Sequence, residues 1–389
     1  MSKKQGGFGA FGASINQRVQ SEITHDIAMG MKLVAIGIQD VARAAGVSAT
    51  TVSNVINGRD AKMRADTRDR VISAMKAMNY TPNALAQQFK SGQNKTIGLM
   101  VPSVASPFWG AVAHHVERAA HLRGYRVLIG NTTRDHAEEV RYGEMLLASG
   151  VRGVILGSAH VPFDHFRPLL DRGMQLASFG GRPAVGNDLL GASVSVDTEL
   201  VGRLSAMHLL GLGHRRIAVL TGPLNSEAQM QRLAGIRSAL ATQGVELDDD
   251  LIWRSRNRGG SDDNEGLEQG RIGVRELLTR LDRPTAIIAQ NDIFAIGAYA
   301  GAADLGFSVP EDLSIVGFDD ILFAAVLQPG LTTIRQPVPD MADDIVSVLV
   351  NQLNNQDGDL QPHIRATPEL IVRGSTSAPR RPGLTANPA

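Results

Sequence analysis

The sequence predicts an α/β protein made of a small all-helical N-terminal unit and a larger unit with two doubly wound parallel sheets. At 389 residues the chain is too long for one ordinary hydrophobic core, so two or three domains are expected. Between Ile38 and Met78 the apolar residues recur at helical spacing, whereas after Gly92 short apolar strands alternate with helical stretches. That alternation is typical of parallel sheets covered on both faces, and the number of strands indicates two sheets.

The composition is that of a globular protein, with 43% hydrophobic and 20% charged residues. The chain contains no cysteine, which excludes a disulfide framework and a thiol nucleophile and argues against a structural zinc site. No apolar run is long enough to span a bilayer, and glycine and polar residues stand where a secretory signal would need an apolar segment. The sequence therefore predicts a cytoplasmic protein with no membrane partner.

The net charge is zero overall but is unevenly distributed. The segment from Lys32 to Lys95 holds ten basic and four acidic residues, whereas residues 96–389 hold 26 basic and 33 acidic residues. A basic module joined to a mildly acidic body favours a polyanionic partner for the module alone. A chance fluctuation in surface charge would give the same counts, so charge by itself leaves that partner open.

The two ends of the chain have no regular pattern. Residues 1–34 are rich in glycine and polar residues and are expected to be a disordered extension, so that Met29 and Met31 are candidate translation starts besides Met1. Residues 375–389 hold three prolines and two adjacent arginines and are expected to form a disordered tail.

Residues 35–82 predict a helix-turn-helix followed by a third helix. In the first helix Val41, Ala42 and Ala45 share one face. Gly46 supplies the positive φ that a sharp turn between helices needs, and Ser48 is a good N-cap for the next helix.

The second helix carries apolar residues at i, i+3 and i+4, namely Val52, Val55 and Ile56, and it ends at Asn57-Gly58. A third helix carries Val71, Met75 and Met78, and Pro82 ends the pattern. In the larger unit the clearest strands are the apolar runs at residues 96–101, 124–129, 153–156, 216–220, 286–289 and 313–317.

The run from Ile38 to Gly58 (IQDVARAAGVSATTVSNVING) strongly resembles the DNA-binding head of the lactose-repressor/galactose-repressor (LacI/GalR) family. Further blocks resemble later landmarks of the family in the same order and spacing. They are residues 78–86 (MNYTPNALA), 212–217 (LGHRRI) with 232–235 (RLAG), 290–292 (QND), 316–319 (VGFD) and 331–337 (LTTIRQP). Together the blocks extend the resemblance over nearly everything from about residue 35 to residue 374.

The resemblance implies a helix-turn-helix domain at residues 35–82, a hinge helix and linker at 83–92, and an effector-binding and dimerisation domain at 93–374. That domain would resemble periplasmic binding proteins, with an N-subdomain (96–178 and 338–365) and a C-subdomain (179–336 and 366–374). A ligand would bind in the cleft between the two sheets, at the carboxyl ends of strands.

In a helix-turn-helix the second helix lies in the major groove, and its N-terminal residues reach base edges. Here the expected outward positions are Ala49, Thr50 and Asn54. Asn bonds bidentately to adenine, while Thr and Ala contact a thymine methyl group. Many family members carry Arg where this chain has Asn54, so an altered base preference is expected. Short polar side chains that suit phosphate oxygens, with capping or surface polarity as the alternative, are Ser48, Thr51, Ser53 and Asn57.

The segment from Asn83 to Lys90 resembles the family's hinge helix, which enters the DNA minor groove when two copies meet. The resemblance adds Tyr80, Asn83 and Ala86 to the expected DNA contacts. Family members usually present Leu where this chain has Phe89. Our hypothesis is that Phe89 intercalates at the operator centre; the alternative is that it packs between the two hinges.

Arg232, Asn291 and Asp319 are the effector contacts that the family implies. A guanidinium, an amide and a carboxylate together suit a polyhydroxylated or otherwise polar ligand. For Arg232 and Asp319 the alternative is a structural ion pair that braces the subdomains. Three further candidates at the carboxyl end of the first strand are Ser106, Phe108 and Trp109. For Trp109 ordinary burial and ligand stacking are both open.

Two other classes of protein share such a fold. A periplasmic-type sugar-binding protein would need a signal peptide and would lack a DNA-binding head. A nucleotide-dependent enzyme would need a glycine-rich loop after a strand, and no G-x-G-x-x-G is found there. We expect no catalytic residues, no metal and no cofactor. The histidines His114, His115 and His214 are expected at the surface or at helix caps.

The sequence therefore predicts a bacterial DNA-binding transcription regulator, a repressor by family default, with a small polar or sugar-like effector. Two copies would bind a palindromic operator, so the protein would be associated with the nucleoid. Prolines 379, 382 and 388 exclude the C-terminal leucine heptads that make tetramers of some family members, which favours a homodimer.

Overall fold

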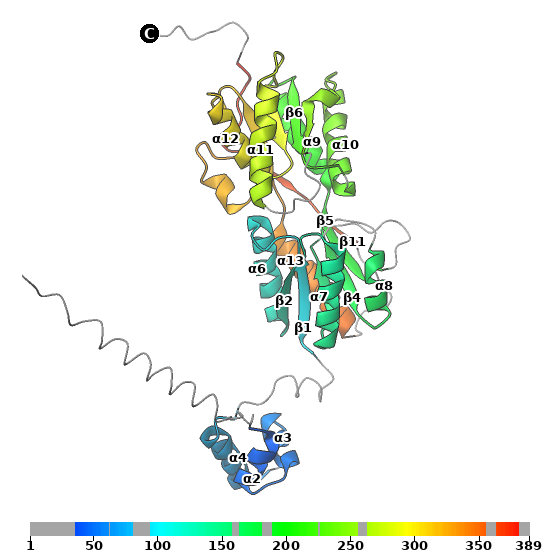
Figure 1. Cartoon of the computed structure of the whole chain (residues 1–389), viewed down its shortest axis with the longest axis vertical. Helices are drawn as coiled ribbons and strands as arrows, with labels where there is room; N and C mark the ends of the chain where they lie inside the picture. Colours follow the sequence, from blue (N-terminus) through cyan, green and yellow to red (C-terminus); the bar gives the residue numbers. More distant parts are fainter. Residues whose placement is uncertain are drawn as a thin grey trace, which may run out of the picture. The chain divides into compact units, whose positions relative to one another are not determined.

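The computed structural model describes eight stretches of the chain, residues 36–61, 63–80, 94–157, 163–180, 189–224, 226–255, 263–354 and 363–380 (Figure 1). The expected N-terminal extension lies outside the described residues, as do the hinge and the last nine residues. The chain divides into two compact units, Met1–Gly92 and Gln93–Ala389.

Residues 36–80 of the first unit form the helices α2 (Ile38–Ala45), α3 (Ala49–Ile56) and α4 (Ala65–Ala77). The predicted turn is confirmed, because Gly46 ends α2 in the left-handed region with φ 65°. The predicted apolar faces are also confirmed, and they meet in one small core whose fully buried members are Val41, Ala42, Ala45, Val52 and Val71.

The second unit contains two six-stranded sheets. The first has the order β11-β5-β4-β3-β1-β2 and is parallel throughout. Its strands are β1 (Thr96–Val101), β2 (Arg126–Asn131), β3 (Gly153–Leu156), β4 (Gln175–Phe179), β5 (Ala192–Val196) and β11 (His363–Ala366). One face packs on α6 (Pro107–Leu122) and α13 (Val338–Leu353). The other packs on α7 (His136–Ala148), the short helix α8 (Arg167–Leu170) and the 3₁₀ turn η1 (Asp164–Phe166).

The second sheet has the order β12-β10-β9-β8-β6-β7, with only the edge strand β12 antiparallel to its neighbour β10. Its strands are β6 (Ile217–Thr221), β7 (Ile252–Arg254), β8 (Ala286–Ala289), β9 (Ser314–Asp319), β10 (Thr332–Arg335) and β12 (Glu369–Ile371). Its helices are α9 (Thr198–Gly211), α10 (Glu227–Ala241), α11 (Asp263–Leu278) and α12 (Asp292–Asp304), with 3₁₀ turns η2 (Asp249–Leu251) and η3 (Leu322–Ala325).

The chain crosses between the two sheets three times, and the first crossing lies at a different position from the one expected. We expected the first crossing after residue 178, whereas β5 pairs with β4 in the first sheet, so the crossing lies at Asp197. The second crossing, between β10 and α13, lies where it was expected. The third follows Ala366, which still pairs within the first sheet opposite Val196. β5 was missed because its ASVSV pattern alternates serine with apolar residues although all five residues are buried.

The segment Ser375–Arg380 is part of the second subdomain, which corrects the expectation of a tail starting at residue 375. The Ser375 hydroxyl donates to the carbonyl of Ile315 (2.6 Å) and accepts from the amide of Thr332 (2.7 Å). His214, expected at the surface or a cap, is instead buried and lies 2.9 Å from the carbonyl oxygen of Ser377 through Nε2. These polar groups find partners far away in the sequence.

Helices α9 and α10 approach each other closely because glycines face each other at the contact. A Cβ atom on Gly202 would lie 2.0 Å from the carbonyl oxygen of Arg232, and one on Gly235 would lie 2.0 Å from that of Glu199. Both carbonyl oxygens belong to the backbone, so they cannot rotate away as the end of a side chain could. No helix within the described residues is long and apolar enough to cross a membrane.

This contact predicts that Gly235→Ala destabilises the second subdomain, because the added methyl group must push α9 and α10 apart. Overpacking of this kind typically costs about 1–3 kcal/mol. The matched control is Gly211→Ala at the end of α9, where a Cβ atom meets nothing within 4 Å. Chemical denaturation of both variants measures the difference. Equal unfolding free energies for the two variants would contradict the close-contact argument.

Candidate functional site

Helix α3, the second helix of the helix-turn-helix, is capped by its own polar residues. The Ser48 hydroxyl accepts from the amide of Thr51 (3.1 Å) and lies 2.9 Å from the Thr51 hydroxyl. At the other end, the Asn57 side chain donates to the carbonyl and hydroxyl oxygens of Ser53 (2.6 and 3.2 Å). All four residues predicted to bind phosphate therefore take part in hydrogen bonds that cap α3. Phosphate binding stays a prediction.

The outward face of α3 is formed by Thr50 and Asn54, which lie four residues apart on one side of the helix. Thr50 is exposed and Asn54 is partly exposed. Ala49 was expected to share this face, but its side chain packs against the head's apolar core. Because α3 contains no charged residue, any base contact that it makes is through neutral side chains.

Basic residues surround α3 rather than lie on it. Arg59 and Arg64 are exposed in the connection to α4, whereas Arg68 pairs with Asp60 at 2.7 Å. Tyr80 packs against the head core and lines a groove beside α3 and α4. The predicted hinge contacts Asn83, Ala86 and Phe89 lie outside the described residues.

In the second unit, one group of candidates lies at the carboxyl edge of the first sheet. Ser106 is buried and caps α6, accepting from the amide of Trp109 at 3.4 Å. The Trp109 ring makes edge contacts with Phe108 (5.1 Å between centroids) and Phe179 (6.3 Å). It also packs over Gly157, where a Cβ atom would lie 2.6 Å from the ring. Trp109 is thus a packed, partly buried residue.

Arg232 lies on α10, at the carboxyl edge of the second sheet. One guanidinium nitrogen donates to the carbonyl of Gln290, and the group stacks 4.0 Å from the centroid of the Phe318 ring. Phe318 itself belongs to the apolar cluster of the first subdomain. Burial lowers the pKa of Arg232 to about 10, while the charge of Asp319 raises it. Arg232 Nε is buried and has no hydrogen-bond partner within the described residues.

Asn291 and Asp319 lie at the carboxyl ends of the neighbouring strands β8 and β9. Asn291 follows β8 and caps α12, accepting from the amide of Phe294 at 3.0 Å. Asp319 ends β9 with φ 113°, a region that residues other than glycine rarely adopt. Its carboxylate accepts from the amide group of Gln336 at 2.7 Å. The structure therefore brings three predicted effector residues to one edge of one sheet.

Gln290 organises this edge, although the sequence singled it out only as part of the QND block. Its side-chain oxygen accepts from the Thr221 hydroxyl (3.1 Å) and from the Gln229 amide (3.2 Å). With Arg232 these residues line a cavity of about 20 Å³. A cavity of that size holds roughly one water molecule and is too small for a metabolite.

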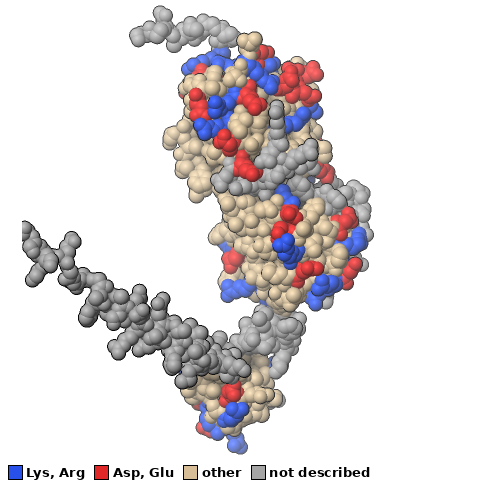
Figure 2. Space-filling view, viewed as in Figure 1, with Lys and Arg blue, Asp and Glu red and all other residues tan. Residues whose placement is uncertain are grey.

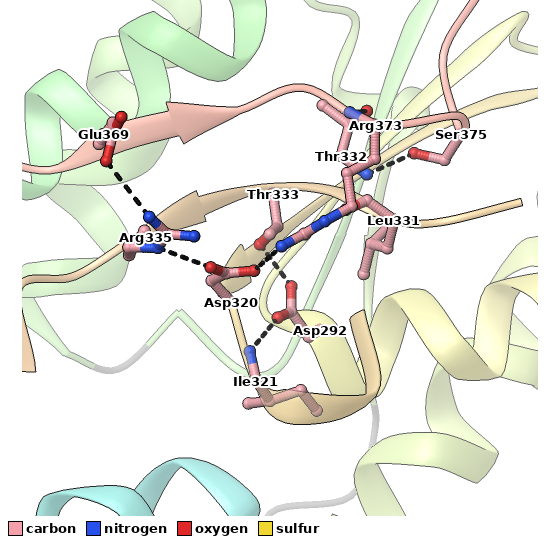
Figure 3. Close-up of polar contacts among 10 residues, drawn as sticks. All are labelled: Asp292, Asp320, Ile321, Leu331, Thr332, Thr333, Arg335, Glu369, Arg373 and Ser375. Atoms are coloured by element: carbon pink, nitrogen blue, oxygen red, sulfur yellow. Dashed lines mark hydrogen bonds and ion pairs between the residues drawn. The ribbon is translucent and has the colours of Figure 1, made fainter. Parts of the chain in front are cut away.

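Asp292 is the buried centre beneath the edge (Figure 3). Its two carboxylate oxygens accept from the Thr333 hydroxyl (2.6 Å) and from the amide of Ile321 (2.8 Å). Gly317 makes room for it, because a Cβ atom there would lie 2.1 Å from the Asp292 carboxylate. Burial raises the pKa of Asp292 to about 7, against the opposing effect of these two hydrogen bonds.

The next acidic residue, Asp320, is held by two arginines (Figure 3). Arg335 of β10 donates to it at 2.7 Å, and Arg373, which follows β12, donates at 2.6 Å. Arg335 also pairs with Glu369 at 3.6 Å. These pairs tie together strand ends next to two of the crossings. These pairs all lie within the second subdomain, and an ion pair of Arg232 with Asp319 stays the alternative to an effector role for those two residues.

A helix-turn-helix joined to a two-sheet domain with polar side chains at its strand ends defines a ligand-responsive DNA-binding regulator. The chain belongs to the LacI family of bacterial regulatory proteins. Residues 37–83 match the profile described as "Bacterial regulatory proteins, lacI family", and residues 206–376 match the "Periplasmic binding protein-like domain".

Three similar proteins illustrate the membership. The HTH-type transcriptional regulator DegA of Bacillus subtilis (strain 168) is 34% identical over 87% of this chain and 98% of its own. The ribose operon repressor of Escherichia coli (strain K12) is 33% identical over 87% of this chain and 99% of its own. The crystal structure of the Lac repressor dimer bound to operator and the anti-inducer ONPF matches with a TM-score of 0.75. The match covers 88% of this chain and 99% of the Lac repressor chain, at 27% sequence identity.

The buried carboxylate predicts a pH-dependent stability. Between about pH 4 and pH 7 the folded protein keeps a proton on Asp292 that the unfolded chain has lost, so the unfolding free energy falls as pH rises through this range. For a pKa that rises from 3.8 to about 7, the loss is at most about 4 kcal/mol. Asp292→Asn should flatten this slope, because an amide cannot ionise.

Urea denaturation at several pH values measures the slope. The control is Asp343→Asn, which removes an exposed carboxylate whose hydrogen bond from Arg123 holds its pKa low. That variant should keep the slope of the unmodified protein above pH 4. An unchanged slope in Asp292→Asn would show that Asp292 is already ionised across this range.

Proposed function

We propose that this protein is a transcriptional repressor that binds a palindromic operator as a homodimer and responds to a small polar effector, with sugars as the first class to test. The observation that carries the effector site is Arg232, a buried guanidinium whose Nε donor has no partner among the residues that the structure describes. Next to it lies Asp319, a carboxylate held at an unfavourable backbone angle. Strained backbone of this kind is concentrated at ligand-binding sites.

The chemistry of this edge favours a ligand with several hydroxyl or carboxylate oxygens. Arg232 offers planar donors, Asp319 offers acceptors, and the Phe318 ring presents an apolar surface under the guanidinium. A hydroxylated ring can bond both charged groups at once. The name of the ribose operon repressor supports a sugar-like effector. Ser106 and Trp109 are proposed to contact it from the first sheet.

The homodimer is supported by an apolar surface on the first subdomain. β2 is an edge strand, and its residues Leu128 and Ile129 are 46% and 50% exposed. Leu122, at the end of α6 just before this strand, is 73% exposed. Exposed apolar strand edges are usually covered by a partner. The Lac repressor structure is that of a dimer on operator, which favours a second copy as the partner.

The proposal places the protein in the cytoplasm, bound to the nucleoid through its operator, with no catalytic step. The helix-turn-helix head favours this over a periplasmic-type sugar-binding protein. On the face of the larger unit drawn in Figure 2, acidic and basic side chains are interspersed, so the proposed DNA contacts are assigned to the head and hinge alone. The hinge wedge by Phe89 remains part of the proposal.

Selection of bound duplexes from a random library, at fixed salt, tests DNA recognition. We expect a palindrome whose half-sites lie about one helical turn apart. Asn54→Ala should relax base preference at one symmetric pair of positions, at a cost of about 1–3 kcal/mol. Arg59→Ala, by contrast, should weaken all sequences equally and lower the salt dependence. If no palindrome is enriched, with or without candidate sugars present, operator binding by this chain is disproved.

The selected operator then tests the effector site. A panel of sugars and sugar acids is screened for a change in operator affinity, which we expect to be about 5–150-fold for the true effector. Asp319→Asn and Arg232→Lys should lose this response while keeping the affinity of the effector-free protein for DNA. Asp343→Asn is the control on an exposed carboxylate. A full response in both site variants would place the effector elsewhere.

A further inference from the structure

A second cluster of polar side chains lies on the first subdomain, apart from the residues assigned above. His136 and Glu139 stand three residues apart in the first turns of α7, so they share one face of the helix. His165 comes from the 3₁₀ turn η1. One nitrogen or oxygen from each of the three side chains lies within 4.8 Å of the others.

The cluster is arranged around a buried carboxylate. Glu139 is only 4% exposed, and its Oε2 lies 2.7 Å from Nε2 of His165. The rings of His136 and His165 are stacked, with centroids 4.1 Å apart and an angle of 7° between their planes. Two imidazole groups are thus held side by side at the same carboxylate. His136 is exposed, which leaves the cluster open to solvent on one side.

We propose that His136, Glu139 and His165 bind a divalent transition-metal ion of the Zn²⁺ type. Two imidazole nitrogens with one carboxylate oxygen form a ligand set that suits zinc, whereas Mg²⁺ and Ca²⁺ prefer oxygen ligands alone. Bonds of about 2.0–2.1 Å in a tetrahedral site place the donor atoms roughly 3.3 Å apart. The donor atoms now lie within 4.8 Å of one another, so binding requires the two histidine rings to turn out of their parallel stacking until both nitrogens face the ion, with the fourth position left for water.

The metal would connect two segments, each of which follows a strand of the first sheet. α7 follows β2, and η1 follows β3; both strands pair with β1. All three strands are parallel, so the site lies at the carboxyl edge that also carries Ser106 and Trp109. An ion there would fix the start of α7 relative to η1. The sequence did not predict it, because the third ligand lies 26 residues beyond Glu139.

The test uses the full-length protein, purified without a polyhistidine tag and treated with a chelator. Isothermal titration with Zn²⁺ should show one tight site per chain, and Zn²⁺ should raise the melting temperature. Co²⁺ should give the visible absorption of a tetrahedral complex. His136→Gln removes an exposed ligand and its stacking on His165 but leaves the Glu139–His165 pair in place, and we expect it to weaken Zn²⁺ binding at least tenfold. His165→Gln should do the same.

The matched control is His114→Gln, which removes an exposed histidine whose ring lies 5.1 Å from that of His115 on α6. It should bind Zn²⁺ as the unmodified protein does. Circular dichroism of the metal-free variants checks their folding. Equal Zn²⁺ affinity in His136→Gln and the unmodified protein would overturn the proposal, as would the absence of a stoichiometric site. Either result would leave a histidine–carboxylate pair with a stacked second ring.

Discussion

The second subdomain depends on the buried carboxylate of Asp292. It joins the start of α12 to the hydroxyl of Thr333 in β10 and to the amide of Ile321 just beyond β9. Asn291 precedes it directly in the sequence, and Asp319 stands two residues before Ile321. The geometry of the proposed effector site is therefore set by an interaction beneath it. An isolated carboxylate in this place would be costly, and its two hydrogen bonds offset only part of that cost.

Charge at this edge is divided between adjacent residues. Asp320 is neutralised by Arg335 and Arg373, whereas Asp319 accepts from the amide of Gln336 and its charge acts on Arg232. Both aspartates have positive φ, so the chain turns sharply where β9 ends. Because Phe318 packs with the first subdomain and also lies under Arg232, movement between the subdomains would be felt at the guanidinium. That contact gives a physical route for coupling.

The sequence predicted most of the head and about half of the strands, for reasons that can be stated. The head helices have clear apolar faces and local caps, and β3 and β8 consist wholly of small or apolar residues. β5 was missed because its buried serines find partners far away, as Ser193 does with His363 at 2.8 Å. Gln290 and Asp292 could be located by the QND block, but their roles required the partners on other strands.

The head separates affinity from specificity. α3 carries no charged side chain, yet the segment from Lys32 to Lys95 has an excess of basic residues. Phosphate attraction, which makes protein–DNA binding salt-dependent, must then come from residues around α3. In the proposed complex, base discrimination by α3 would fall to Thr50 and Asn54, which act only at short range. On this proposal, a substitution on α3 would change the preferred sequence while leaving the electrostatic attraction intact, because the two depend on different residues.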